Sequence, residues 1–319
     1  AVMNTDRVLW HLAAENAFAD DDSYIFKGEM DYSLYWEPES GRMTTQEYDG
    51  NTVLDAPNAT WSPFYHESDV NYPLMNRLFA VPALRQRYLA HMRTIVNEEL
   101  DMTTFNNLVD GYKAMIDTMV QNDTKKLMTY AEFTSGVTNL KSTRTTRVNT
   151  INANSEFAQT APTISNTEHE VAAGLNEAPV GGESVDVRTT VSSTSGIYQV
   201  KLFYSTTLWG RFSRVTMLDD GTHNDGAAGD GTYGATIPGT AQGTWVRYYI
   251  EAASNNTAHT VKYDPLGAEH NVFVYHVAIP AAPATGVVIN ELMADNATTA
   301  IDENGQYEDW IELHNTGGT

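Results

Sequence analysis

The spacing of apolar residues divides the chain into a helical half and a β-strand half. Near the start, Val8, Leu9, Leu12 and Ala13 recur at helical spacing after Thr5, which we expect to be the N-cap. Three longer stretches with the same period follow, at residues 84–95, 105–119 and 133–148. We predict a small helical layer in which the Met and aromatic stripes pack into a core rather than line a ligand groove.

The period changes after a polar stretch, residues 153–183, which contains Pro162, Pro179 and a Gly-Gly pair. This composition indicates a linker and the entry to a new domain. Beyond it, apolar and polar residues alternate in short runs separated by Gly, Asn and Asp, as in half-buried strands. We predict an antiparallel immunoglobulin-like β-sandwich over residues 184–278.

The last part of the chain begins a further β-domain. Residues 279–286, rich in Ala and Pro, are expected to form a second linker. Residues 287–319 contain two strand-like runs, which are too few to close a sandwich. The predicted fold class is therefore multidomain, α+β and then all-β: residues 1–152 form the first part, and an immunoglobulin-like sandwich and a truncated second sandwich follow it.

Composition narrows the function classes. The 319 residues include 41 Asp and Glu against 19 Lys and Arg, a formal net charge of −22 that repels nucleic acids and anionic lipids. We predict neither a nucleic-acid partner nor a membrane span. The sequence has no cysteine, which excludes disulfides, thiolate metal sites and a cysteine nucleophile. An acidic, cysteine-free, Thr/Asn/Gly-rich chain favours a secreted or cell-surface bacterial protein whose signal peptide was removed or lies upstream.

Two segments resemble the spore-coat CotH kinase family over roughly residues 5 to 152. The family has an N-x-D-x-Y loop, an H-N-Y-x-L-Y strand, a D-P-x-x-G-R hairpin and a W-D-x-D motif. The matching segment here is DRVLWHLAAENAFADDDSYIFKGEMDYSLYWEPESGRMTTQEYDGN. The family's P-L-x-x-R-L-L-x-V-P-x-F-R-x-R-Y segment corresponds to YPLMNRLFAVPALRQRYLAHM. The resemblance implies an atypical kinase fold, of which this chain holds the C-terminal part, with the ATP-covering lobe expected before Ala1.

The same resemblance implies phosphoryl transfer from ATP, with Mg²⁺ or Mn²⁺, to protein hydroxyl groups. By position, Asp22 would be the catalytic base, and Asp31 and Asp49 would hold metal, with Asn51 at the second aspartate of W-D-x-D. An Asn at that position removes a charge and a strong oxygen ligand. The alternative is that these carboxylates only form a solvated acidic surface.

A second acidic cluster lies in LDDGTHNDGAAGDGTYGATIP, residues 218–238. Glycines there permit tight turns, and oxygen-rich loops of this kind suit Ca²⁺. The run resembles a hairpin common in immunoglobulin-like modules of secreted bacterial proteins. In the alternative interpretation, the side chains bond only to their own backbone. The candidate calcium ligands are Asp219, Asp220, Asn224, Asp225 and Asp230.

The tail resembles the opening of a lamin-tail domain through Ile289-Asn290-Glu291 and the run DWIEL with Asn315. Trp310 and Ile311 would then be core anchors.

Two functions remain open. One is a secreted CotH-like protein kinase with accessory β-domains, acting on a secreted or surface protein. The other is a structural or adhesive surface protein with a degenerate kinase-like domain and calcium-stabilised β-modules; the oligomeric state is left open.

Overall fold

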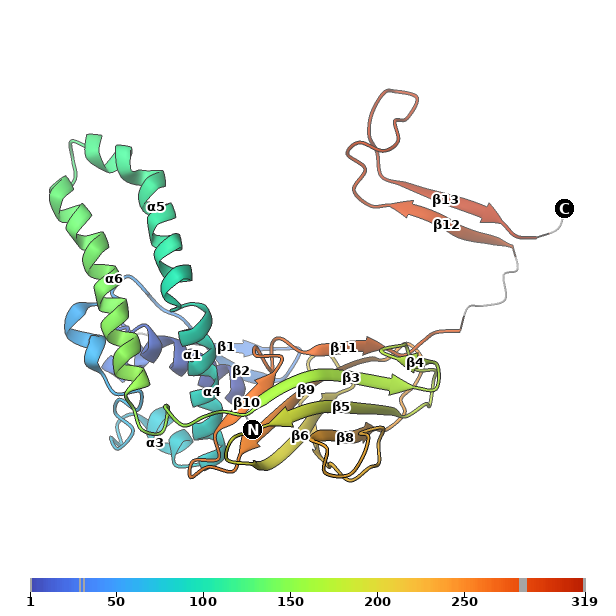
Figure 1. The fold of residues 1–319 in the computed structure, drawn as a ribbon. Coiled ribbons are helices and arrows are strands. Elements are labelled where there is room, and N and C mark those ends of the chain that lie inside the picture. The colour runs from blue at the N-terminus through green and yellow to red at the C-terminus, as the bar shows by residue number, and fades with distance from the viewer. Residues whose placement is uncertain (1, 29, 31, 281–285, 318–319) are drawn as a thin grey trace.

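The structure, a computed structural model, describes residues 2–28, 30, 32–280 and 286–317 (Figure 1). Its first part is built on α1 (Thr5–Ala17), which packs against α4 (Pro82–Glu98). The N-cap of α1 is Asn4, whose side chain accepts from the Arg7 amide; the predicted N-cap, Thr5, is already helical. Pro82 opens α4 at a position where its missing amide hydrogen costs nothing.

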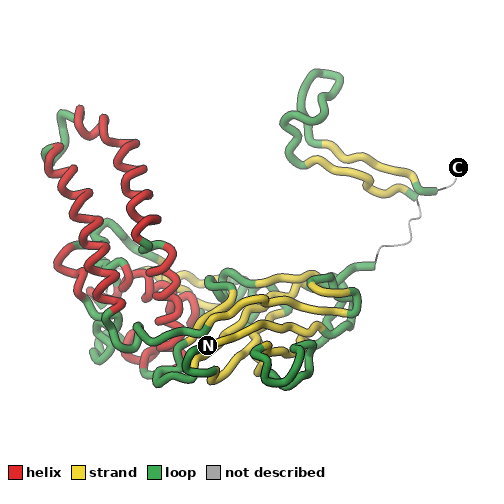
Figure 2. The backbone as a smooth tube through the Cα atoms, in the orientation of Figure 1, coloured by secondary structure: helices red, strands yellow, loops and turns green. Residues whose placement is uncertain are grey.

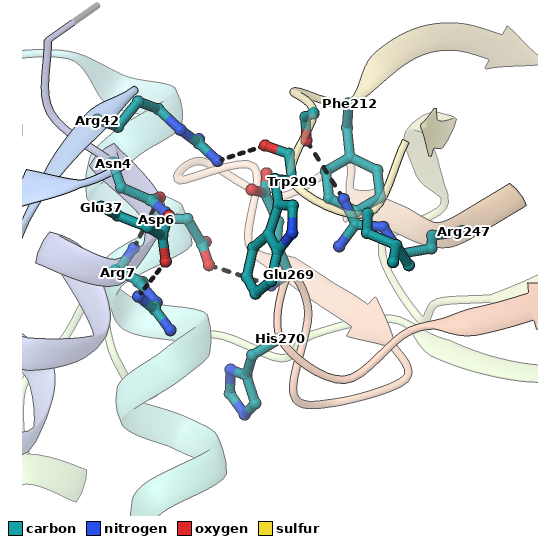
Figure 3. Close-up of a pocket in the computed structure, with 12 residues that line it drawn as sticks. Asn4, Asp6, Arg7, Glu37, Arg42, Trp209, Phe212, Arg247, Glu269 and His270 are labelled. Carbon is teal, nitrogen blue, oxygen red and sulfur yellow. Dashed lines mark hydrogen bonds and ion pairs between the residues drawn. The ribbon is translucent and has the colours of Figure 1, made fainter. Parts of the chain in front are cut away.

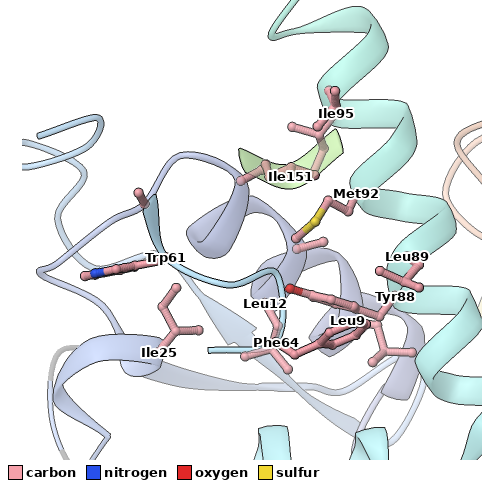
Figure 4. Packing of buried hydrophobic residues seen from close by; sticks show 14 of the residues in the cluster. Leu9, Leu12, Ile25, Trp61, Phe64, Tyr88, Leu89, Met92, Ile95 and Ile151 are labelled. Atoms are coloured by element: carbon pink, nitrogen blue, oxygen red, sulfur yellow. The ribbon is translucent and has the colours of Figure 1, made fainter. Parts of the chain in front are cut away.

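The remaining elements of this part are short helices and one hairpin. They are α2 (Tyr24–Lys27), β1 (Ser33–Glu37), β2 (Arg42–Gln46), the 3₁₀ helix η1 (Ala56–Thr60) and α3 (Pro73–Phe79). Apolar side chains of α2, of α3 and of the segment after η1 meet those of α1 and α4 in one core (Figure 4). The core includes Leu9, Leu12, Ile25, Trp61, Phe64, Tyr88, Leu89, Met92, Ile95 and Ile151.

Two long helices, α5 (Met102–Asn122) and α6 (Tyr130–Asn152), project from this core as an antiparallel pair (Figures 1 and 2). A capping box at Thr129 and Glu132 begins α6. The prediction that the apolar stripes pack into a core is wrong for α5. Phe105 is its one buried residue, whereas Tyr112 and Met115 are 60% and 71% exposed. No described element covers that face, so helical periodicity there is not accompanied by burial.

The second part is an antiparallel β-sandwich, as predicted. One sheet has the order β4-β3-β5-β8, and the other has the order β10-β9-β6-β7, with β11 pairing to the remaining part of β9. Apolar side chains of the two sheets form a core between them. The strands are β3 (Thr163–Val171), β4 (Gly174–Leu175), β5 (Val185–Ser192), β6 (Ile197–Ser205), β7 (Ser213–Met217), β8 (Thr232–Ile237), β9 (Trp245–Ser254), β10 (Val261–Asp264) and β11 (Phe273–His276).

The sandwich begins earlier than expected, because β3 lies inside residues 153–183, the stretch interpreted as a linker and entry segment. Further along, β12 (Val287–Met293) and β13 (Trp310–Asn315) pair with each other as a separate hairpin. Ile311, predicted to be a core anchor, is 62% exposed. Most of the expected linker 279–286 lies outside the described residues. No helix in the described ranges is long and apolar enough to cross a bilayer.

A polar junction joins the helical part to the sandwich. The indole of Trp10 stacks on His91 at 4.0 Å and donates to the Ala268 carbonyl at 3.2 Å. Nε2 of His91 lies 2.9 Å from Oδ1 of Asp6. Burial lowers the pKa of His91, while the hydrogen bond and charges of His91 and Arg87 hold the pKa of Asp6 low despite burial. Oδ2 of Asp6 also accepts from the Glu269 amide at 3.0 Å, so this buried carboxylate on α1 bonds to both parts.

Candidate functional site

The loop after α1 meets the segment that follows β2. The Asp20 carboxylate is almost fully buried and accepts from the Asp22 amide at 3.0 Å and from the Thr52 hydroxyl at 3.5 Å. On the other side of the loop, Asp21 accepts from the Asn58 amide group at 2.9 Å. The fold therefore places the loop aspartates beside the segment that carries the degenerate W-D-x-D motif.

The predicted kinase residues occupy this region. Asp22 is mostly buried and forms an ion pair with Lys27. Both oxygens of Asp49 accept from Asn51, one from its amide and one from its side chain, each at 3.1 Å. Asp31 lies outside the described residues. The structure thus brings the Asp22 loop and the Asp49–Asn51 turn together through the Thr52 contact.

Three further residues gather at the same end of α1, and the sequence analysis did not single them out. His11 and Glu15 lie one turn apart on α1, and Glu47 follows β2 directly. Their ligand atoms all lie within 4.8 Å of one another. His11 and Glu15 could have been recognised as an i,i+4 pair, and Glu47 as a charge where the CotH family has an apolar run.

The neighbouring carboxylates contribute to a raised pKa of Asp20. Burial raises the pKa of Asp20 to about 6, and the charges of Glu47, Glu15 and Asp21 add to the increase. Burial lowers the pKa of His11, but the Glu15 carboxylate outweighs it, so the pKa of His11 is raised overall. The end of α1 is therefore a strongly negative, largely desolvated environment that favours positive charge.

The predicted calcium loop is bonded mainly to its own backbone. Asp219 accepts from the amides of Gly229, Asp230 and Gly231 at 2.6 to 3.2 Å. Asp225 is 1% exposed; its Oδ2 accepts from the Asp220 amide at 3.0 Å, and its Oδ1 has no partner.

The other candidate ligands are bonded in the same way. Asp220 accepts from Thr222, Asp230 accepts from Ala227 and Thr232, and the Asn224 side chain donates to Asp186. Within the described part of the chain, these carboxylates do not form a group of three whose oxygens lie within 4.8 Å of one another. The geometry favours the alternative interpretation of a self-bonded turn, and calcium binding stays a prediction.

We expect Asp219→Ala to lower the melting temperature of the sandwich in the presence of a chelator, because three backbone amides lose their acceptor. The expected loss is about 1–3 kcal/mol in the free energy of unfolding. Thermal unfolding of the full chain with chelator and with millimolar Ca²⁺ measures it, and Glu177→Ala, at an exposed position of the sandwich outside this loop, is the control. An equal loss in both buffers supports the backbone role. A loss seen only with Ca²⁺ would contradict it and support a calcium site.

A cavity of about 210 Å³ lies at the junction of the two parts (Figure 3). Its arginines already have partners: Arg7 pairs with Glu37 at 3.0 Å, and Arg42 and Arg247 donate to carbonyls of the loop that contains Trp209. None of the predicted site residues lines it. We therefore assign this cavity to the junction and place the candidate site at the end of α1.

The helical part is similar to CotH kinase proteins, and the sandwich is similar to an immunoglobulin-like domain. Residues 1–151 match the family described as CotH kinase protein, and residues 182–257 match the conditioned medium factor second Ig-like domain. No curated protein matches the chain. Among solved structures, the crystal structure of the C-terminal domain of wzt aligns with 38% of this chain and 75% of its own. Its 14% identity and TM-score of 0.27 are too low to support an argument.

Proposed function

We propose that residues 1–152 take part in metal-dependent phosphoryl transfer from ATP to a hydroxyl group of a secreted or surface protein. One observation carries the proposal: Thr52 bonds to Asp20, so the Asp22 loop and the Asp49–Asn51 turn lie side by side. Phosphoryl transfer needs such a pairing, because one acidic group must orient the acceptor while another holds the cation.

The residues fit these roles. Asp22 would hold the acceptor hydroxyl and take its proton. Asp49 is only partly buried, and each of its oxygens accepts one hydrogen bond, which leaves lone pairs free for a cation. When bound, ATP with Mg²⁺ or Mn²⁺ supplies the phosphoryl group and the charge that stabilises its transfer. Arg147, which donates to the carbonyls of Asn16 and Ala17, holds the backbone that leads into the loop.

We expect Asp22→Asn to lower the rate of transfer of labelled γ-phosphate from ATP by at least about 100-fold, since Asn cannot take a proton. The intact protein that contains this chain is assayed with Mg²⁺ and with Mn²⁺, using itself and a general protein acceptor as substrates. Asp55→Asn is the matched control, because Asp55 lies just after the Asp49–Asn51 turn and caps η1, a role that Asn performs equally well. Equal rates in both variants would reject the role of Asp22.

If the intact protein that contains this chain neither transfers phosphate nor binds ATP, the second function follows: a structural surface protein that retains the kinase-related fold. The observation in its favour is Asn51 at the second motif position. In that case the sandwich and the β12–β13 hairpin, which we propose is the start of a lamin-tail-like domain, would carry the function as spacers.

A further inference from the structure

The cluster of His11, Glu15 and Glu47 contains unpaired polar atoms in a dry environment. The Glu15 side chain is 1% exposed; its Oε2 has no partner, and its Oε1 contacts only Nε2 of His11, at 2.8 Å. The His11 side chain is 8% exposed, and this ion pair does not have the geometry of a hydrogen bond. Buried polar atoms are nearly always paired, so this cluster lacks a partner that its surroundings require.

The charge balance points to the nature of that partner. Glu15, Glu47 and Asp20 bring three carboxylates together, and within the described ranges the ion pairs of Glu15 and Glu47 are with His11 alone. A protonated His11 would offset one of these charges. A divalent cation bound to a neutral imidazole would offset two and would also bond to the unpaired oxygens.

We infer that His11, Glu15 and Glu47 form a binding site for a first-row divalent transition metal ion such as Zn²⁺ or Mn²⁺. One imidazole nitrogen with two carboxylates is a ligand set that suits these ions, whereas Ca²⁺ and Mg²⁺ prefer oxygen alone. The Glu47 side chain is half exposed, which gives the ion a route from solvent. Three protein ligands leave a coordination position open to water or another ligand. This site differs from the one proposed for phosphoryl transfer, which uses Asp22 and Asp49.

The test is Zn²⁺ retention by the full chain. The protein is stripped with a chelator, incubated with Zn²⁺ in excess Mg²⁺, dialysed and analysed for metal content. We expect one tightly held Zn²⁺ per chain and at least tenfold weaker binding in His11→Gln and Glu15→Gln. His66→Gln is the matched control, because His66 also lies near an acidic residue, with Nδ1 3.7 Å from Asp69, but on a more exposed surface. Visible absorption of Co²⁺ bound in place of Zn²⁺ would report the nitrogen ligand without any activity assay.

The outcomes separate this inference from the proposed function. Asp49→Asn should keep its Zn²⁺ while its phosphoryl transfer falls, and a chain inactive with ATP should still bind Zn²⁺. Circular dichroism shows whether each variant folds, and if the two α1 variants do not, Glu47→Gln at the half-exposed position decides. The inference would be overturned if the unaltered chain retained no Zn²⁺. It would also be overturned if folded His11→Gln or Glu47→Gln retained as much Zn²⁺ as the unaltered chain, or if Mg²⁺ displaced Zn²⁺ at equal concentration.

Discussion

Replacing Arg87 by methionine is expected to uncouple the helical part from the sandwich and to split thermal unfolding into two transitions. The Arg87 guanidinium, 13% exposed, lies 3.2 Å from Asp6 and 2.9 Å from Glu269. It also donates to the hydroxyls of Tyr249 and Tyr263, each at 3.0 Å. Without it, the Asp6 carboxylate stays buried with less compensation, which typically costs about 3–5 kcal/mol.

Scanning calorimetry of the full chain measures this effect, since two-state unfolding of the joined parts should give way to separate melting. Arg188→Met is the control: Arg188 pairs with Glu168 and Glu170 on the sandwich surface, where such pairs contribute about 1 kcal/mol or less. If the Arg87 variant melts in one transition and loses no more than the control, the junction does not couple the two parts.

The sequence predicted the elements whose periodicity is not interrupted. Pro82 and the apolar positions after it predicted the α4 helix, and the alternation in β5, β6 and β9 predicted the sandwich. Strand β3 was missed for a physical reason. A bulge between Ser165 and Glu168 interrupts its alternation, and the buried position at His169 holds a polar residue.

The α5 stripe shows the opposite error. Its apolar spacing predicted a buried face, but periodicity reports only that one side of a helix is apolar and not that another element covers it. Phe105 is buried in the core and Val109 packs against it, but the rest of α5 extends beyond the core with α6. Local pattern therefore predicted the helix correctly and its packing incorrectly.

The sequence likewise predicted one part of the candidate site and missed another. The resemblance to the CotH family indicated Asp22 and Asp49, and the fold brings their segments together. The sequence marks Glu47 as an unusual charge but could not place it beside His11, because that contact depends on how β2 packs against α1. The burial of Asp20 and its closeness to Glu47 and Glu15, which together raise its pKa, are likewise properties of the tertiary structure.

The second large effect is expected at Arg147, where methionine should destabilise the helical part by about 3 kcal/mol or more. Arg147 is fully buried on α6 and donates to Oδ1 and the carbonyl of Asn16 at 2.6 and 2.7 Å. It also donates to the carbonyls of Ala17 and Trp61. No carboxylate is among these partners, and burial lowers the pKa of Arg147 to about 10. Its contribution is therefore to satisfy buried carbonyls, which methionine cannot do.

Hydrogen exchange gives the more specific measurement, because Arg147 holds the backbone just before the Asp20–Asp22 loop. Amides of residues 16–22 should exchange at least tenfold faster in Arg147→Met, while those of β5 and β9 in the sandwich keep their rates. Arg77→Met, at an exposed position on α3, should change neither stability nor exchange. Faster exchange spread evenly over the helical part would mean that Arg147 supports the core as a whole. Exchange confined to residues 16–22 would mean that α6, through this one side chain, holds the loop that carries the proposed catalytic base.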